Sequence, residues 1–390
     1  MNRKQSIYRS LVSFLFLSFF ILIGKGALID EAKEALFNGQ NLTGEELLER
    51  ALKENPKLEK NSLYMLLAGR VAFLNYDFEE ANDFFSKYDQ AITKAKQKPD
   101  EILEIWEREL EIAESAFDRV QKITVIDSIS VPANRFLEAY RLSPSAGRLL
   151  NAGELPNVSS NKRVSQGYIN EGKDYMILGV VDANGNSELM ETSNLLGSGW
   201  QEPTPLPEEI NGESGAAFPF MMSDGSTLYF AAEGENSMGG YDIFVAQRDP
   251  STGEYLQPLN VGMPFNSPYN DFMMAIDEET GIGWWATDRN SQPGYLNIYV
   301  YQLSDVRRNY SPDDENLSDL AFLTDYRMTQ DASKSNEYKE IMKSIASLGN
   351  EEQAPDPDFY FPVGNGKVYH HISDFRNREA AKKMTLYLEQ

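Results

Sequence analysis

Two periodicities of apolar residues divide the chain. Between residues 27 and 122, apolar side chains recur at the three- and four-residue spacing of helices, as in Glu46–Leu52, where the pattern stops before Pro56. Beyond residue 123, short apolar runs alternate with turns rich in Gly, Asp and Pro, which is typical of antiparallel strands. The sequence therefore predicts a helical part over 27–122 and a β part over 123–310.

The best-defined helical segment is a predicted hairpin over 62–96. Its small residues Gly69 and Ala81 would let two antiparallel helices approach closely, with Phe78 and Phe85 filling the space beside them and residues 75–77 forming the turn. This spacing is that of a tetratricopeptide repeat. Flanking helices are expected over 44–54 and 100–121. A stand-alone three-helix bundle is the alternative, because repeat arrays usually need several units for stability.

The β part is organised around residues 219–249. Thr227–Phe230 alternates as a half-buried strand does, Asp224-Gly225 before it is a hairpin turn, and Gly239-Gly240 leads into a strand over 241–245. Similar runs follow at 271–277, 283–287 and 296–300, and fainter ones precede it at 172–179 and 187–192. We expect these copies to form small antiparallel sheets, and the strand Val125–Val131 to join the last of them.

The run SDGSTLYFAAEG…GGYDIFVA resembles the WD40-like β-propeller repeat of the Tol-B type. The longer run NVGMPFNSPYNDFMMAIDEETGIGWWATDR and the segment VIDSISVPANRFLEAYRLSPSAG resemble a Bacteroidota family of exported proteins that combine tetratricopeptide repeats with such a propeller. The resemblance covers roughly residues 60–300 and implies a propeller over 123–310, a fold that hosts many functions.

Seven residues of the repeat motif are expected to be structural. Carboxylates and glycines at matching repeat positions bond turn amides or allow tight turns, so their recurrence favours a scaffold role. They are Asp224, Gly225, Gly239, Gly240, Asp242, Asp288 and Arg289.

Both ends of the chain carry separate segments. Residues 1–26 combine a basic start with the apolar run Leu11–Ile23, which is typical of a cleaved signal peptide, although an uncleaved anchor is the alternative. The region 311–390 is predicted to be a polar linker and a small ββα unit, with a hairpin around Gly364–Lys367 and a closing helix over 374–389. The expected fold class is thus multidomain α and β.

Charge and composition narrow the partners. The chain holds 36 Lys and Arg against 60 Asp and Glu, a net charge of −24, which becomes −28 when residues 1–26 and their four basic side chains are removed. Such a charge disfavours nucleic acid and anionic lipid. The sequence has no cysteine, which excludes a direct lipid anchor on that residue. The signal segment points to the periplasm, the outer membrane or the cell surface.

Catalytic and metal-binding patterns are weak. The two histidines, His370 and His371, are adjacent, and no nucleophile motif, phosphate-binding loop or zinc ligand set accompanies them. The acids Asp277–Glu279 are numerous enough for a glycosidase pair, but they fall at a predicted turn that already explains them. We therefore expect no enzyme activity, cofactor or metal.

The candidate binding residues are of two kinds. Leu66, Arg70 and Phe73 would share one stripe of a helix that is open to a peptide, unless Arg70 forms an ordinary surface ion pair with Asp77 or Glu79. Three tryptophans suit a protein surface or sugar stacking, or alternatively a blade core: Trp200, Trp284 and Trp285. The sequence predicts a non-enzymatic, exported adaptor for proteins of the cell envelope, with a glycan-binding module or glycosidase-like propeller as the alternative. It leaves the oligomeric state open.

Overall fold

The structure is a computed structural model, and it describes residues 27–155, 162–195, 199–212, 214–348, 361–364, 367–369, 372, 375 and 378–388. The predicted signal segment, His370 and His371 lie outside these residues. The chain divides into two compact units, Met1–Met342 and Lys343–Gln390. The helical part and the sheets therefore belong to one unit.

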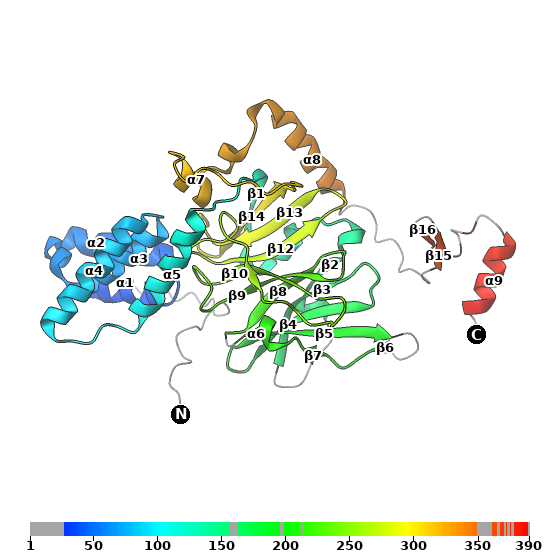
Figure 1. Ribbon diagram of the computed structural model, residues 1–390, viewed down its shortest axis with the longest axis horizontal. Helices are drawn as coiled ribbons and strands as arrows, with labels where there is room; N and C mark the ends of the chain where they lie inside the picture. The colour runs from blue at the N-terminus through cyan, green and yellow to red at the C-terminus, as the bar shows by residue number, and fades with distance from the viewer. Residues whose placement is uncertain are drawn as a thin grey trace. The chain divides into compact units, whose positions relative to one another are not determined.

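Helices fill the first part of the larger unit (Figure 1). Two of them begin at side-chain caps: Asn61 accepts hydrogen bonds from the backbone N–H groups of Leu63 and Tyr64, and Asp77 accepts one from Glu80. Such caps satisfy amides that a helix leaves unpaired at its start. The helices are α1 Ala27–Phe37, α2 Asn41–Glu54, α3 Ser62–Leu74, α4 Phe78–Ala95 and α5 Ile102–Phe117.

The predicted close crossing of α3 and α4 is confirmed. A Cβ atom added to Gly69 would lie 2.5 Å from the Phe85 ring, so only glycine fits there. The turn between the two helices falls at residues 75–77 as expected.

Three antiparallel sheets follow the helices. The first has the order β2-β3-β4-β5-β6, with β7 also paired to β5; the second is β11-β10-β9-β8 and the third β1-β14-β13-β12. In the first sheet the strands are β2 Arg148–Asn151, β3 Lys162–Ile169, β4 Tyr175–Asp182, β5 Ser187–Leu195, β6 Gly199–Trp200 and β7 Thr204–Pro205. In the other two they are β8 Ala216–Met221, β9 Thr227–Ala232, β10 Asp242–Gln247, β11 Leu259–Asn260, β12 Asp271–Asp277, β13 Ile282–Thr287, β14 Tyr295–Gln302 and β1 Thr124–Pro132.

The strand predicted at Val125–Val131 does join the last sheet. It forms β1, the outermost strand, and pairs antiparallel with β14 across Pro132 and Tyr295 at one end and Thr124 and Gln302 at the other. Within the described ranges, however, the three sheets do not close into a ring. What the structure establishes is thus a helical region followed by antiparallel sheets.

The second and third sheets are copies of each other, with an offset that differs in part from the sequence prediction. Ala217 pairs with Ala231 where Phe272 pairs with Ala286, an offset of 55 positions. The match of 271–277 with 219–224 was wrong by three residues, because it aligned Phe220 with Phe272 by residue type, whereas the pairing register places Phe272 where Ala217 lies. Both strands carry a β-bulge at matching positions. In each bulge a residue other than glycine has positive φ, Phe218 in β8 and Met273 in β12.

Short helices and a small second unit complete the chain. The segment expected to be a linker runs into α7 Leu317–Phe322, and α8 Ser335–Ser347 follows. The second unit contains the predicted hairpin and closing helix: β15 Phe361–Gly364, β16 Lys367–Tyr369 and α9 Arg378–Leu388. The remaining short helices are η1 Pro56–Lys60, η2 Ala133–Ala139, η3 Pro144–Ala146, η4 Ala152–Glu154, α6 Glu208–Asn211, η5 Tyr326–Thr329 and η6 Ala332–Lys334.

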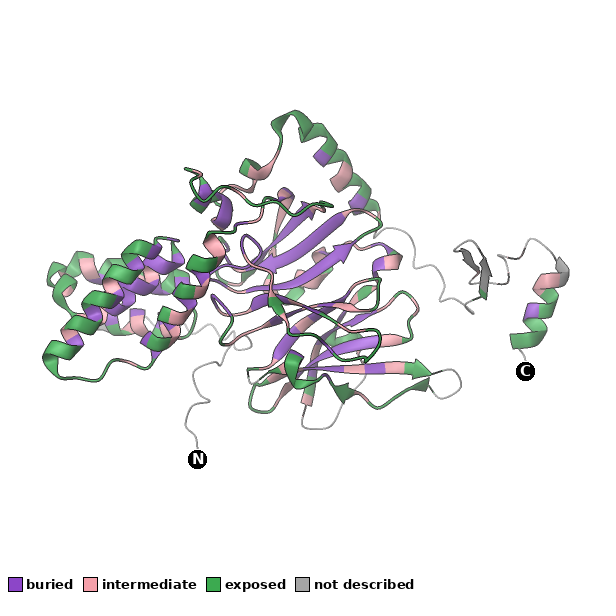
Figure 2. Ribbon diagram, viewed as in Figure 1, coloured by how far each residue is buried: buried purple, intermediate pink, exposed green. Residues whose placement is uncertain are grey.

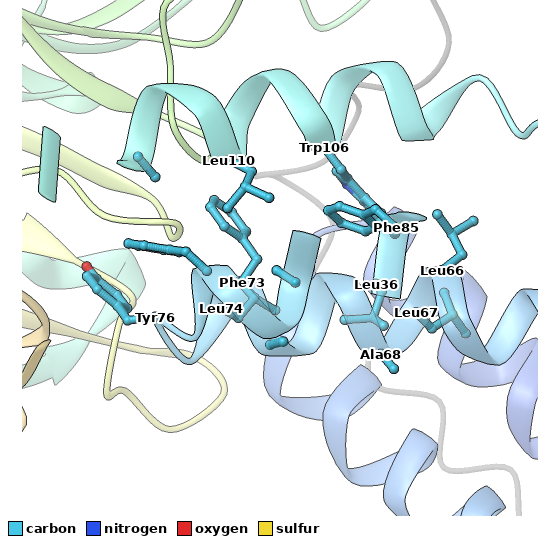
Figure 3. Close-up of a cluster of buried hydrophobic side chains, with 14 of the residues drawn as sticks. Leu36, Leu66, Leu67, Ala68, Phe73, Leu74, Tyr76, Phe85, Trp106 and Leu110 are labelled. Atoms are coloured by element: carbon cyan, nitrogen blue, oxygen red, sulfur yellow. The ribbon is translucent and has the colours of Figure 1, made fainter. Parts of the chain in front are cut away.

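One apolar core joins the helices to the loops of the sheets. It contains the inner faces of α1–α5 together with Met238, Met263, Tyr269, Leu317 and Ala321. Figure 2 shows these buried segments in purple, and Figure 3 shows Tyr76 at the end of the helical core. Because the core is continuous, the helices and sheets pack as one body and not as two parts on a linker.

Candidate partner-binding surfaces

The helical stripe proposed for partner binding is not available. Leu66, Arg70 and Phe73 are all buried, because α1, α2, α4 and α5 all contact α3. Figure 3 shows Leu66 and Phe73 among the core side chains. The segment LYMLLAGRVAFL is apolar on nearly every side, and a helix with that pattern is buried all round. That signal was present in the sequence.

Arg70 has a different ion-pair partner from the two that the sequence suggested. Its Nη1 lies 2.5 Å from Glu109 Oε2 on α5, and both side chains are nearly excluded from solvent at 8% and 7% exposure. The guanidinium also lies over the rings of Phe73 and Trp106, 5.0 and 5.2 Å from their centroids. Burial raises the pKa of Glu109, while the Arg70 charge opposes that shift. The pair therefore fixes α3 to α5.

Only one of the three candidate tryptophans is exposed. Trp284 and Trp285 are fully buried on β13, where Trp285 packs edge-on against Phe265. Trp200 is 39% exposed on the two-residue strand β6, beside Leu195 at 52%. The register places their side chains on opposite faces, since Asn194 pairs with Trp200 and Leu195 with Gly199. Trp200 is therefore an isolated exposed aromatic side chain at the outer edge of the first sheet.

The repeat motif residues hold turns and loops in place. Asp224 accepts hydrogen bonds from the N–H groups of Ser226 and Thr227, and Gly225 after it has φ +66°. Asp242 accepts from Met238 N and Asn260 Nδ2, at 3.0 and 2.7 Å. These hydrogen bonds fix the turns and loops that connect strands of the second sheet.

The two glycines of the Gly-Gly turn work through close packing. Glycine could be needed here for a left-handed conformation or for a close approach of the backbone; neither residue has positive φ, so only the second reason applies. A Cβ atom on Gly239 would lie 2.5 Å from the carbonyl oxygen of Tyr269, and one on Gly240 would meet the Asn270 side chain. The turn therefore lies against the loop that leads into β12.

Asp288 and Arg289 lie in a buried polar network between the second and third sheets. Arg289 donates to Asp271 Oδ1 at 2.7 Å and to the carbonyls of Phe265 and Ala321. Asp288 accepts from Asn270 N and Nδ2, at 2.8 and 2.7 Å. Burial raises the pKa of Asp288 to about 6 and also raises that of Asp271, where the Arg289 charge acts against the shift.

Aromatic stacking and backbone bonds connect this network to the helices. Tyr76, at the end of α3, contacts Phe322 with ring centroids 5.1 Å apart, and Phe322 also contacts Tyr269 at 6.1 Å. The backbone N–H of Gln121 donates to Met263 O. Glu233 lies near this joint, where burial, with a further contribution from Glu109, raises its pKa to about 7.

Two of the three acids considered for glycosidase chemistry, Asp277 and Glu279, accept hydrogen bonds from the segment 143–145. Both carboxylate oxygens of Asp277 accept from Ser143, one from its N–H at 2.7 Å and one from its hydroxyl at 2.8 Å. Glu279 accepts from the Ser145 hydroxyl at 2.6 Å. The described residues include no group of three or more His, Cys, Asp or Glu placed to hold a metal ion.

An open polar pocket of about 290 Å³ lies beside the outer strand of the third sheet, and sequence reasoning missed it. It is lined by Ser128 of β1, by Asn297 and Tyr299 of β14, and by Asn290 and the segment 323–327. Two of these residues, Asn290 and Leu323, have positive φ. The full lining is Ser128, Asn290, Asn297, Tyr299, Leu323, Thr324, Asp325, Tyr326 and Arg327.

Comparison with known proteins adds no assignment. No family model, curated protein or solved structure matches the chain. Among the described residues, no helix is both long and apolar enough to cross a membrane.

Proposed function

We propose that this protein is a non-enzymatic, exported adaptor that binds protein partners in the cell envelope. The exposed Trp200 on the edge strand β6 carries the proposal. Tryptophan at an exposed edge combines a large apolar area with an N–H donor, and it is one of the residue types enriched among the side chains that dominate protein interfaces. The leader-like residues 1–26 support export.

The three sheets are proposed to be blades of a WD40-like propeller. Two observations support this: the second and third sheets repeat with an offset of 55 positions, and each of the three sheets has a bulged strand, β3, β8 or β12, paired with the next strand along the chain. A scaffold of stacked blades leaves short outer strands such as β6 at the surface. The tetratricopeptide-like nature of α3 and α4 stays a proposal of the same kind.

The glycan alternative loses most of its aromatic support. Sugar stacking needs an exposed aromatic ring, and the rings of Trp284 and Trp285 are buried. A glycan site at Trp200 is then an outcome that the following experiment distinguishes from protein binding.

The test is affinity purification from envelope fractions with the chain from residue 27 onwards, followed by rebinding of the recovered partner in purified form. Trp200→Ala should weaken rebinding about 30-fold, the loss that corresponds to an interface side chain worth about 2 kcal/mol. Leu256→Ala is the matched control, because Leu256 is another exposed apolar residue, at 55%, just before the outer strand β11 of the second sheet. Equal binding by wild type and Trp200→Ala, or recovery of glycan without protein, would overturn the proposal.

A further inference from the structure

We propose that the outer edge of β1 over Ser128–Pro132, with the adjoining polar pocket, binds an extended peptide segment of a partner as an added strand. This rests on the proposed protein-binding role and assigns it a second surface, on the third sheet. An added strand gains affinity from main-chain hydrogen bonds and specificity from pockets that receive alternate side chains.

Along β1, residues that hydrogen-bond β14 alternate with residues whose backbone N–H and C=O face outward. Ala133 N donates to Gly294 O, so residues 131 and 129 also bond β14, and the residues between them do not. The bonds on the other side of β14 give the same alternation. Leu303 N donates to Gly281 O, so residues 299 and 297 of β14 bond β13, and the residues between them bond β1. Ser128 and Ser130 therefore turn their backbone groups away from the sheet.

The usable edge is short and has defined ends. At one end Thr329 Oγ1 and Gln330 Nε2 already bond the backbone of Val125, so a partner strand cannot pair there. At the other end Pro132 has no N–H to donate. Between them Ser130 is exposed, with an N–H and a C=O directed outward. Ser128 offers only its C=O, because its N–H already donates to Asp127 Oδ1 at 2.9 Å. This length suits a peptide of a few residues, not a long strand.

The pocket lies where a side chain of the added strand would enter. Ser128 pairs with Tyr299 and Ser130 with Asn297, so these four side chains share one face of the sheet. Tyr326, which also lines the pocket, donates a hydrogen bond from its hydroxyl to Asp127 Oδ1 at 3.4 Å. Arg327 forms an ion pair with Asp325, with Nε and Oδ1 2.8 Å apart. The Arg–Asp pair balances its own charge, and the remaining lining residues carry hydroxyl or amide groups, apart from the apolar Leu323. The pocket therefore fits a small uncharged polar side chain such as Ser, Thr or Asn.

The experiment selects peptides from a random seven-residue phage-displayed library on the chain from residue 27 onwards. Binding of the selected peptides is then measured by fluorescence anisotropy. Ser130→Pro removes the outward N–H, which an edge strand tolerates, and should weaken binding at least about ten-fold, since that donor is central to the pairing. Ser130→Thr, which keeps the N–H, should retain binding. Tyr326→Phe should weaken the peptides that carry a polar residue at the pocket position.

A second measurement uses the wild type, so it does not depend on whether the Ser130→Pro variant folds. Hydrogen exchange of the Ser130 amide should slow when a selected peptide is bound. The inference is overturned if no peptide is selected, if selected peptides bind Ser130→Pro as they bind wild type, or if free N-acetylglucosamine displaces them from the pocket. Trp200→Ala should bind these peptides normally. Failure at β1 and failure at Trp200 are thus separate results.

Discussion

The buried Arg70–Glu109 pair provides the sharpest test of the helical packing. Arg70→Met keeps most of the side-chain volume but leaves the Glu109 carboxylate buried with no cationic partner at 2.5 Å. Breaking a buried pair from one side typically costs about 3–5 kcal/mol, because an uncompensated charge remains in a region of low dielectric. We expect a loss of that size in the free energy of unfolding, measured by urea denaturation of the chain from residue 27 onwards.

The reciprocal and double variants separate the charge from the packing. Glu109→Leu should cost a similar amount, since it isolates the guanidinium, whereas Arg70→Met with Glu109→Leu should return to within about 1 kcal/mol of wild type. The Arg70→Met loss should also depend on pH. Without Arg70, burial raises the pKa of Glu109 with only the Arg108 charge to oppose it, so stability is present at low pH and is lost as pH rises through that pKa.

Two outcomes would refute this reasoning. If Arg70→Met costs less than about 1 kcal/mol, the pair is not buried as the structure shows, because exposed pairs are worth that little. If the double variant is as unstable as the sum of the single variants, the side chains do not interact. Loss of partner binding by a well-folded Arg70→Met variant would restore the original surface role of Arg70.

Two further predictions concern the sheets. Gly239→Ala should lower the free energy of unfolding by about 1–3 kcal/mol, because the new methyl group meets the Tyr269 carbonyl, while Gly153→Ala, with open space around it, should change thermal melting little. Glu233→Gln should stabilise the protein by about 1–3 kcal/mol at pH 8 and have little effect at pH 5. The wild-type pKa of Glu233 is raised from 4.5 to about 7, so its favourable contribution is lost across that window. Urea titrations at both pH values check this, and parallel pH profiles for variant and wild type would contradict it.

Local signals account for what the sequence predicted well. The α3–α4 hairpin depends on Gly69, on the cap Asp77 and on residues close to it in sequence. The hairpin around Asp224-Gly225 likewise depends on a carboxylate that bonds amides two and three residues away. Such features are encoded within a few residues, so periodicity and turn chemistry find them.

The errors concern what surrounds an element. Helical spacing correctly grouped Leu66, Arg70 and Phe73, but it could not tell that other helices cover every side of α3. Trp284 and Trp285 point to opposite faces of β13, and both faces are buried because sheet and loop pack on each. The pocket escaped prediction for a similar reason, since it joins residue 128 to 290–299 and 323–327 through the long-range pairing of β1.

One short segment, residues 317–330, connects the helical core to the proposed peptide edge. Ala321 accepts a hydrogen bond from the buried Arg289, Phe322 packs on Tyr76 of the helical part, and Tyr326 lines the pocket beside β1. Gln330 then closes one end of that edge. Because these contacts lie within fourteen residues, a shift of the segment at the helices would also change the pocket and the length of free edge. If β1 binds a peptide as proposed, the buried polar network also contributes to that binding, because Arg289 holds the segment that limits the free edge.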